Sequence, residues 1–170
     1  VCSSDLDAAT ATPPAMPRHP RQTAAALAGN TPDEVEAQFY EALQRADLDL
    51  MMAVWADDDE IVCVHPGGGR VVGTAAIRAS FEAIFGNGAV PAEPEQVHRM
   101  QWLGGALHHL VERIEVPAEG GSEGATQTAW VLATNVYVKT PQGWRMAAHH
   151  ASPGSLQELP GPGDAPATLH

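Results

Sequence analysis

Residues 31–85 read TPDEVEAQFYEALQRADLDLMMAVWADDDEIVCVHPGGGRVVGTAAIRASFEAIF, a stretch in which helical periodicity is interrupted by one short hairpin. Thr31-Pro32-Asp33-Glu34 is a capping box with proline at the first helical position, and apolar residues at helical spacing follow it. We expect Asp47 to cap a second, shorter helix, and Thr74 to cap a third that ends at Gly86. The stretch therefore predicts two helices, a hairpin and a further helix.

The hairpin and the rest of the chain supply the strands. Residues 60–65 form an apolar run that ends at a Pro-Gly-Gly-Gly turn, and 70–73 predict a short return strand. Beyond residue 86 the period changes from helical to two, which predicts strands at 96–103, 105–116, 125–139 and 143–151. The fold class is therefore α+β, with three N-terminal helices on a curved, mainly antiparallel sheet. Such a pairing of layers encloses a pocket.

Length and composition indicate one domain. The 170 residues are 44% hydrophobic, which is enough apolar material for a single core. Residues 1–30 and 153–170 are rich in small residues and proline without sustained periodicity, and we expect both to be disordered tails around a domain at 31–152. The chain starts at Val1 rather than Met, which is compatible with a non-native start.

The charge and the cysteines exclude several classes of function. A formal net charge of -12 repels phosphate backbones and anionic lipid, so we expect neither nucleic acid nor a membrane as partner. The chain lacks a long apolar run and a signal-peptide pattern, which favours a cytoplasmic location. Cys2 and Cys63 form no CxxC pair, and we expect no cofactor.

Four motifs in order resemble a known pattern: ADLD at 46–49, WADDD at 55–59, HPGG at 65–68 and GTAAIR at 73–78. Their arrangement is similar to the first half of the ketosteroid isomerase pattern, which the SnoaL-like domains of the nuclear transport factor 2-like superfamily share. The resemblance covers 31–152 and implies a cone-shaped α+β fold with a hydrophobic pocket. It does not fix the activity, because that superfamily includes isomerases, cyclases, dehydratases and binding modules.

The resemblance implies roles for single residues. His65 occupies the place of the isomerases' catalytic aspartate, and imidazole can accept a proton near neutral pH. The tyrosine of their oxyanion hole corresponds to Phe39 and the protonated aspartate falls near Thr134, so the main donors are lost. We therefore do not expect steroid isomerisation unless Tyr40, Asn135 or a tryptophan N–H supplies the missing contacts.

His149 and His150 end the last predicted strand and are candidate catalytic partners of His65. Strand alternation sends them to opposite faces, so at most one enters the pocket. His150 shares its face with Trp144 and Met146, which favours His150 as the inward residue, although both remain candidates. Either one has the alternative of a polar strand end in solvent.

A metal site is chemically possible but has no motif behind it. His65, one of His149 and His150, and one of His108 and His109 together would suit zinc or iron. Their spacing supplies no local ligand pair such as HxxxH on a helix. We therefore expect no metal.

Candidate pocket residues also include Trp55, Trp102 and Trp130, because indole rings often line ligand cavities. Large aromatics on strands and helices serve more often as core or dimer contacts, so that alternative remains open. Asn135 is polar in the middle of an apolar strand and either faces solvent or contacts a ligand.

Two classes of function follow. The first is an acid–base enzyme, an isomerase, dehydratase or hydrolase, that acts on a mostly apolar, carbonyl-bearing small molecule with His65 as base. The second is a non-catalytic module that binds a small apolar ligand or forms a homodimer through its sheet.

Overall fold

The computed structural model of the chain describes residues 29–120, 122 and 124–154. The tails predicted at 1–30 and 153–170 lie almost wholly outside the described residues. At the first of these residues, the carbonyl of Gly29 accepts a hydrogen bond of 3.2 Å from the backbone N–H of Trp144. Gly29, which the prediction assigns to the N-terminal tail, is thus hydrogen-bonded to the folded domain.

Two helices open the domain, as the sequence predicts. Helix α1, Pro32–Arg45, is capped by the hydroxyl of Thr31, which accepts the N–H of Glu34 at 3.2 Å. Helix α2, Leu48–Val54, is capped by Asp47, whose carboxylate accepts the N–H of Leu50 at 2.9 Å. Each cap satisfies a donor that the first helical turn would otherwise leave without a partner.

A hairpin and a third helix follow. Strands β1, Val62–Val64, and β2, Arg70–Val72, pair antiparallel, and helix α3 runs over Thr74–Phe85. The prediction that Thr74 caps this helix is wrong. The N-cap is Gly73, which has no side chain to cap with, and the Thr74 hydroxyl instead donates to the carbonyl of Asp58 at 3.4 Å.

The second half of the domain is the predicted four-stranded meander. Its strands are β3, Ala92–Trp102; β4, Gly105–Pro117; β5, Thr126–Thr140; and β6, Gly143–Pro153. Strand β3 starts earlier than predicted because a bulge around Gln96, whose φ is +51°, interrupts its alternation. The sheet order is β2-β1-β6-β5-β4-β3, and β1 runs parallel to β6 while the other pairs are antiparallel.

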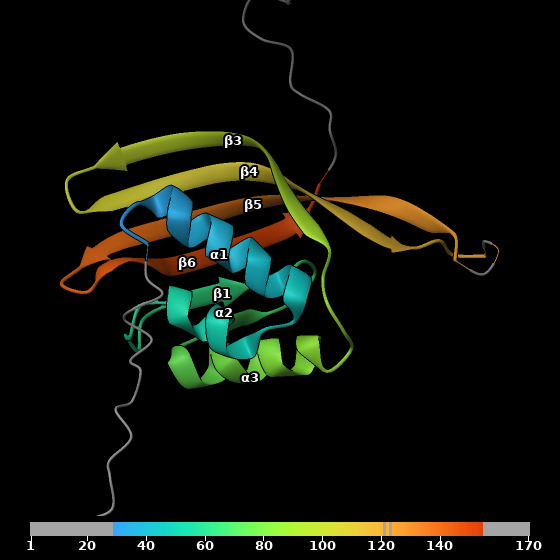
Figure 1. Ribbon diagram of the computed structural model, residues 1–170, viewed down its shortest axis with the longest axis horizontal. Coiled ribbons are helices and arrows are strands. Elements are labelled where there is room, and N and C mark those ends of the chain that lie inside the picture. The colour runs from blue at the N-terminus through green and yellow to red at the C-terminus, as the bar shows by residue number, and fades with distance from the viewer. Residues whose placement is uncertain (1–28, 121, 123, 155–170) are drawn as a thin grey trace, which may run out of the picture.

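The three helices cover one face of this open, six-stranded sheet (Figure 1). The core lies between the two layers, and the largest side chains that it buries completely are Tyr137, Phe39, Phe81 and Met51. Burying such a side chain contributes roughly 1.5–3 kcal/mol. This arrangement confirms the α+β class, and it leaves the other sheet face uncovered by helices in the described part of the chain.

No helix among the described residues is long and apolar enough to cross a membrane.

Candidate functional site

A cavity of about 160 Å³ lies between the helices and the sheet. Most of its wall is apolar, and its three titratable groups come from three different places in the chain: His65 after β1, Glu112 in β4 and His149 in β6. The full lining is Phe39, Leu43, His65, Pro66, Phe81, Ile84, Val90, Ala92, Glu112, Ile114 and His149. An apolar hollow with a few converging polar groups is the usual form of a small-molecule site.

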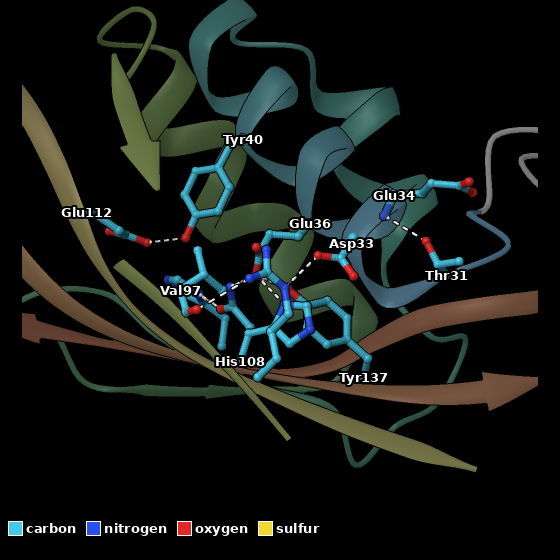
Figure 2. Close-up of polar contacts among 12 residues, drawn as sticks. Thr31, Asp33, Glu34, Glu36, Tyr40, Val97, His108, Glu112 and Tyr137 are labelled. Atoms are coloured by element: carbon cyan, nitrogen blue, oxygen red, sulfur yellow. Dashed lines mark hydrogen bonds and ion pairs between the residues drawn. The ribbon is translucent and has the colours of Figure 1, made fainter. Parts of the chain in front are cut away.

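Glu112 is the residue of this wall that the sequence analysis missed. It is only 4% exposed, and its carboxylate accepts a hydrogen bond of 2.8 Å from the Tyr40 hydroxyl, as Figure 2 shows. Burial raises the pKa of Glu112 to about 7, and the Tyr40 hydrogen bond opposes part of that rise. Near neutral pH the carboxyl group therefore both holds and releases a proton. Its position between Leu110 and Ile114 on one strand face was the available signal.

His65 lines the cavity with its imidazole against the ring of Phe81, at a centroid distance of 5.0 Å. Its Nε2 lies 3.1 Å from the hydroxyl of Ser80, which itself donates to the carbonyl of Ile77 at 2.8 Å. Since the Ser80 proton is already used, we assign the proton of this contact to Nε2, which leaves Nδ1 as an acceptor. Burial lowers the pKa of His65, so the ring is neutral near pH 7.

His149, rather than His150, faces the cavity. The alternation that favoured His150 is broken by a bulge: Val136 pairs with Ala148 while its neighbour Tyr137 pairs with Met146. The extra residue between the two pairs inverts the faces of the strand from that point on. His149 is 4% exposed, whereas His150 lies exposed on the outer face, so its prediction as the inward histidine is wrong.

A buried amide orients His149. Nδ1 of His149 lies 2.7 Å from Oδ1 of Asn135, and the amide nitrogen of Asn135 lies 3.5 Å from Oε2 of Glu36. Because the amide nitrogen of Asn135 faces the Glu36 carboxylate, the amide oxygen faces His149. Nδ1 of His149 therefore carries the proton, and its Nε2 is an acceptor. Burial lowers the pKa of His149 to about 3, and this ring stays neutral at physiological pH.

Glu36 organises the polar cluster behind this amide. The same oxygen, Oε2, lies 2.8 Å from Nδ1 of His108 and accepts the Tyr137 hydroxyl at 2.9 Å (Figure 2). Four polar groups from α1, β4 and β5 thus meet in the core without solvent. The sequence analysis missed Glu36 and Tyr137 because this contact joins residues 101 positions apart. His108 is held in this cluster by Glu36.

The remaining predicted site residues divide into three groups. Phe39 lines the cavity, and its ring lies 4.9 Å from that of His149. Tyr40 and Asn135 lie outside the lining, but each bonds to a group in it. Thr134, in contrast, pairs with His150 on the opposite sheet face, so placing it at the pocket was wrong.

The tryptophans do not line this cavity. Trp55 is 3% exposed in the core and belongs to a different hollow, Trp102 is 50% exposed at the end of β3, and Trp130 is half-buried in β5. Trp55 is thus a core residue, which is one of the two alternatives stated for such aromatics. Across residues 29–154, apart from 121 and 123, no group of three or more His, Cys, Asp or Glu side chains is placed to hold a metal ion.

The fold defines a class of protein, the cone-shaped α+β domains of the nuclear transport factor 2-like superfamily. Residues 33–155 match a sequence model of the SnoaL-like domain, and the chain belongs to that family. Among curated proteins, none is significantly similar to the chain.

Solved structures give the same assignment. One is a Thiobacillus denitrificans protein that is named as a candidate calcium/calmodulin-dependent protein kinase type II association domain. Its sequence is 37% identical and its TM-score is 0.65, and the match covers 74% of this chain and 96% of that protein. A candidate dehydratase of the nuclear transport factor 2-like family from Streptomyces avermitilis is 29% identical with a TM-score of 0.62. That match covers 73% of this chain and 99% of the dehydratase chain. A ketosteroid isomerase-like protein from Erwinia carotovora atroseptica, 18% identical with a TM-score of 0.58 over 79% and 98%, shares the fold.

Proposed function

We propose that the protein is an acid–base catalyst that moves protons on a small, mostly apolar, carbonyl-bearing substrate held in the cavity of about 160 Å³. The observation that carries the proposal is Glu112, a carboxyl group in an apolar wall whose pKa is raised to about 7. A group with such a pKa is suited to both giving and taking a proton at neutral pH.

The geometry supports a division of roles. Nδ1 of His65 is the base, and protonated Glu112 is the acid or hydrogen-bond donor to a substrate oxygen. His149 presents the acceptor Nε2 of a neutral ring, which suits a substrate hydroxyl. These roles replace the acid and base of the ketosteroid isomerase pattern with different residues.

A dehydration illustrates the chemistry. His65 takes the proton on the carbon next to a carbonyl, and Glu112 gives its proton to the hydroxyl one carbon further on. A C–H and a C–O bond break, a C=C bond forms, and the hydroxyl leaves as water; Glu112 regains a proton as His65 releases one. The name of the Streptomyces avermitilis relative favours this reaction over isomerisation or hydrolysis.

The cavity limits the size of the substrate. The cavity has a volume of about 160 Å³. It lies below the range of roughly 300–1,000 Å³ typical of sites for drug-sized ligands. We therefore expect a substrate smaller than a steroid.

Hydrogen–deuterium exchange tests the proposal without knowledge of the natural substrate. Small ketones such as cyclohexanone and 4-hydroxy-2-butanone are incubated with the protein in deuterated water, and loss of their α-proton signals is followed by NMR. We expect exchange that falls by about a hundredfold in His65→Gln and in Glu112→Gln. Equal exchange with the wild type and both variants would overturn the proposal.

A second candidate, an assembly module, is favoured by a separate observation. Met100, Trp102 and Leu103, at the β3–β4 turn, are 57%, 50% and 102% exposed, next to a sheet face that no described helix covers. The relative from Thiobacillus denitrificans is named for association. The occupant that we infer is a second copy of this chain, because closed twofold pairs are the commonest assemblies. Light scattering at micromolar concentration should give a dimer that Trp102→Glu dissociates, and a monomer would contradict it.

A further inference from the structure

A second and larger cavity, of about 640 Å³, shares no lining residue with the first. It lies between the end of α2, the loop after it, the start of α3 and the β5–β6 turn. Its lining is Met52, Ala53, Trp55, Ala56, Asp57, Asp58, Thr74, Val138, Thr140, Pro141, Gln142 and Arg145. Some of its polar groups lack the hydrogen-bond or ion-pair partners that buried groups usually have.

Arg145 is a nearly buried cation without a counter-ion. It is 7% exposed, and its Nη1 donates to the carbonyls of Trp144 at 2.9 Å and Gln142 at 3.2 Å. In the part of the chain that the structure describes, no carboxylate lies within ion-pair distance of it, although Arg99 and Arg113, which are both more exposed, have such partners. Because buried charges are normally paired, Nε and Nη2 of Arg145 are available donors for an anion.

Trp55 and the start of helix α3 also line the same cavity. Trp55 is 3% exposed, and its Nε1 is buried with no hydrogen-bond partner among the described residues. Helix α3 starts at Thr74 without a side-chain cap, so its first backbone N–H groups and the positive end of its dipole adjoin the cavity.

The other wall carries negative charge. Asp57 and Asp58 are exposed and line the cavity, and Asp58 already accepts the backbone N–H of Glu60 at 2.8 Å. These carboxylates disfavour a doubly charged anion such as phosphate, and they attract a cationic group. A ligand that satisfies both walls carries one carboxylate and one ammonium group.

We propose that this cavity binds a small zwitterion, with its carboxylate at Arg145 and its ammonium group at Asp57 and Asp58. The site is independent of the proposed acid–base function, because the two cavities have no residue in common. Loss of one activity therefore leaves the other measurable.

The experiment titrates the full chain with β-alanine, 5-aminopentanoate and 6-aminohexanoate, and separately with pentanoate, which lacks the ammonium group. Binding is followed by the ¹H–¹⁵N signal of the Trp55 indole, assigned with Trp55→Phe. We expect at least one amino acid of the series to shift that signal and to bind more tightly than pentanoate. Arg145→Gln should weaken binding about tenfold or more, and Asp57→Asn should remove the preference over pentanoate.

Arg99→Gln is the matched control, because Arg99 pairs with Asp33 on the surface and lines neither cavity. Since Arg145 also supports the β5–β6 turn, Arg145→Lys retains the charge and reports on folding through its melting temperature. Binding that survives Arg145→Gln, or an indole signal that no probe of the series moves, would overturn the proposal.

Discussion

The amide oxygen of Asn135 lies 2.7 Å from Nδ1 of His149, and both side chains are buried between the helices and the sheet. The other end of the amide faces Glu36, so it cannot turn over without opposing its oxygen to a carboxylate. A residue outside the cavity thereby decides which nitrogen of a cavity residue is free to meet a ligand.

Asn135→Asp should raise the pKa of His149. Burial holds that pKa at about 3, and a carboxylate at hydrogen-bond distance stabilises the imidazolium form. We expect a rise of about two units, measured from the pH dependence of the His149 ring signals by NMR. Thr134→Asp is the matched control, because Thr134 lies on the opposite face beside His150. A His149 titration that is the same in both variants would contradict the assigned contact.

Glu112→Gln should change how stability depends on pH. The folded chain raises the pKa of Glu112 from 4.5 to about 7, so between these values it binds more protons than the unfolded chain. Stability therefore falls as pH rises through this window. Removing the carboxyl group should stabilise the variant relative to the wild type by about 2 kcal/mol more at pH 8 than at pH 5.

Urea denaturation at the two pH values measures this difference. Glu82→Gln, which replaces an exposed carboxylate on α3, is the control and should show little of the effect. Parallel pH curves for wild type and Glu112→Gln would mean that Glu112 has an ordinary pKa.

Tyr40→Phe should move the activity of the cavity to higher pH. The Tyr40 hydroxyl donates to the Glu112 carboxylate and so favours its charged form. Without that donor the pKa of Glu112 rises, and Glu112 remains an acid at more alkaline pH. The pH above which the exchange rate of a small ketone falls should therefore be higher than in the wild type. An unchanged pH would remove Glu112 from the mechanism.

Cys63 should be unreactive in the folded chain. It is fully buried, and burial raises the pKa of its thiol to about 12, so almost no thiolate exists at pH 8. In a Cys2→Ser background, iodoacetamide should label Cys63 only after denaturant is added, as mass spectrometry would show. Labelling of the native protein at the rate of the unfolded chain would contradict its burial.

The helices and the meander could be predicted from the sequence because their signals are local. The caps at Thr31 and Asp47 and the change to period two lie within a few residues of what they specify. The sheet face on which His149 lies could not be predicted, because a bulge in β6 inverts the alternation of faces. No residue type in the strand indicates this bulge. Glu36 was missed for a different reason, since its partners are brought to it only by the packing of α1 on the sheet.

The candidate site was predictable only in part. The resemblance to the ketosteroid isomerase pattern pointed to His65, which lies in the cavity wall. Glu112 has no counterpart in the motifs that carried the resemblance. Its burial depends on three strands and two helices closing around it, which its place between Leu110 and Ile114 on one strand face indicates only weakly.

The most direct test of this account is the titration of the Glu112 carboxyl carbon by ¹³C NMR in the full chain, assigned with Glu112→Gln. A midpoint near pH 7 is the predicted result. A midpoint near 4.5, the value of a solvated glutamate, would contradict the proposed mechanism, because Glu112 would then be charged at neutral pH and could not act as the acid.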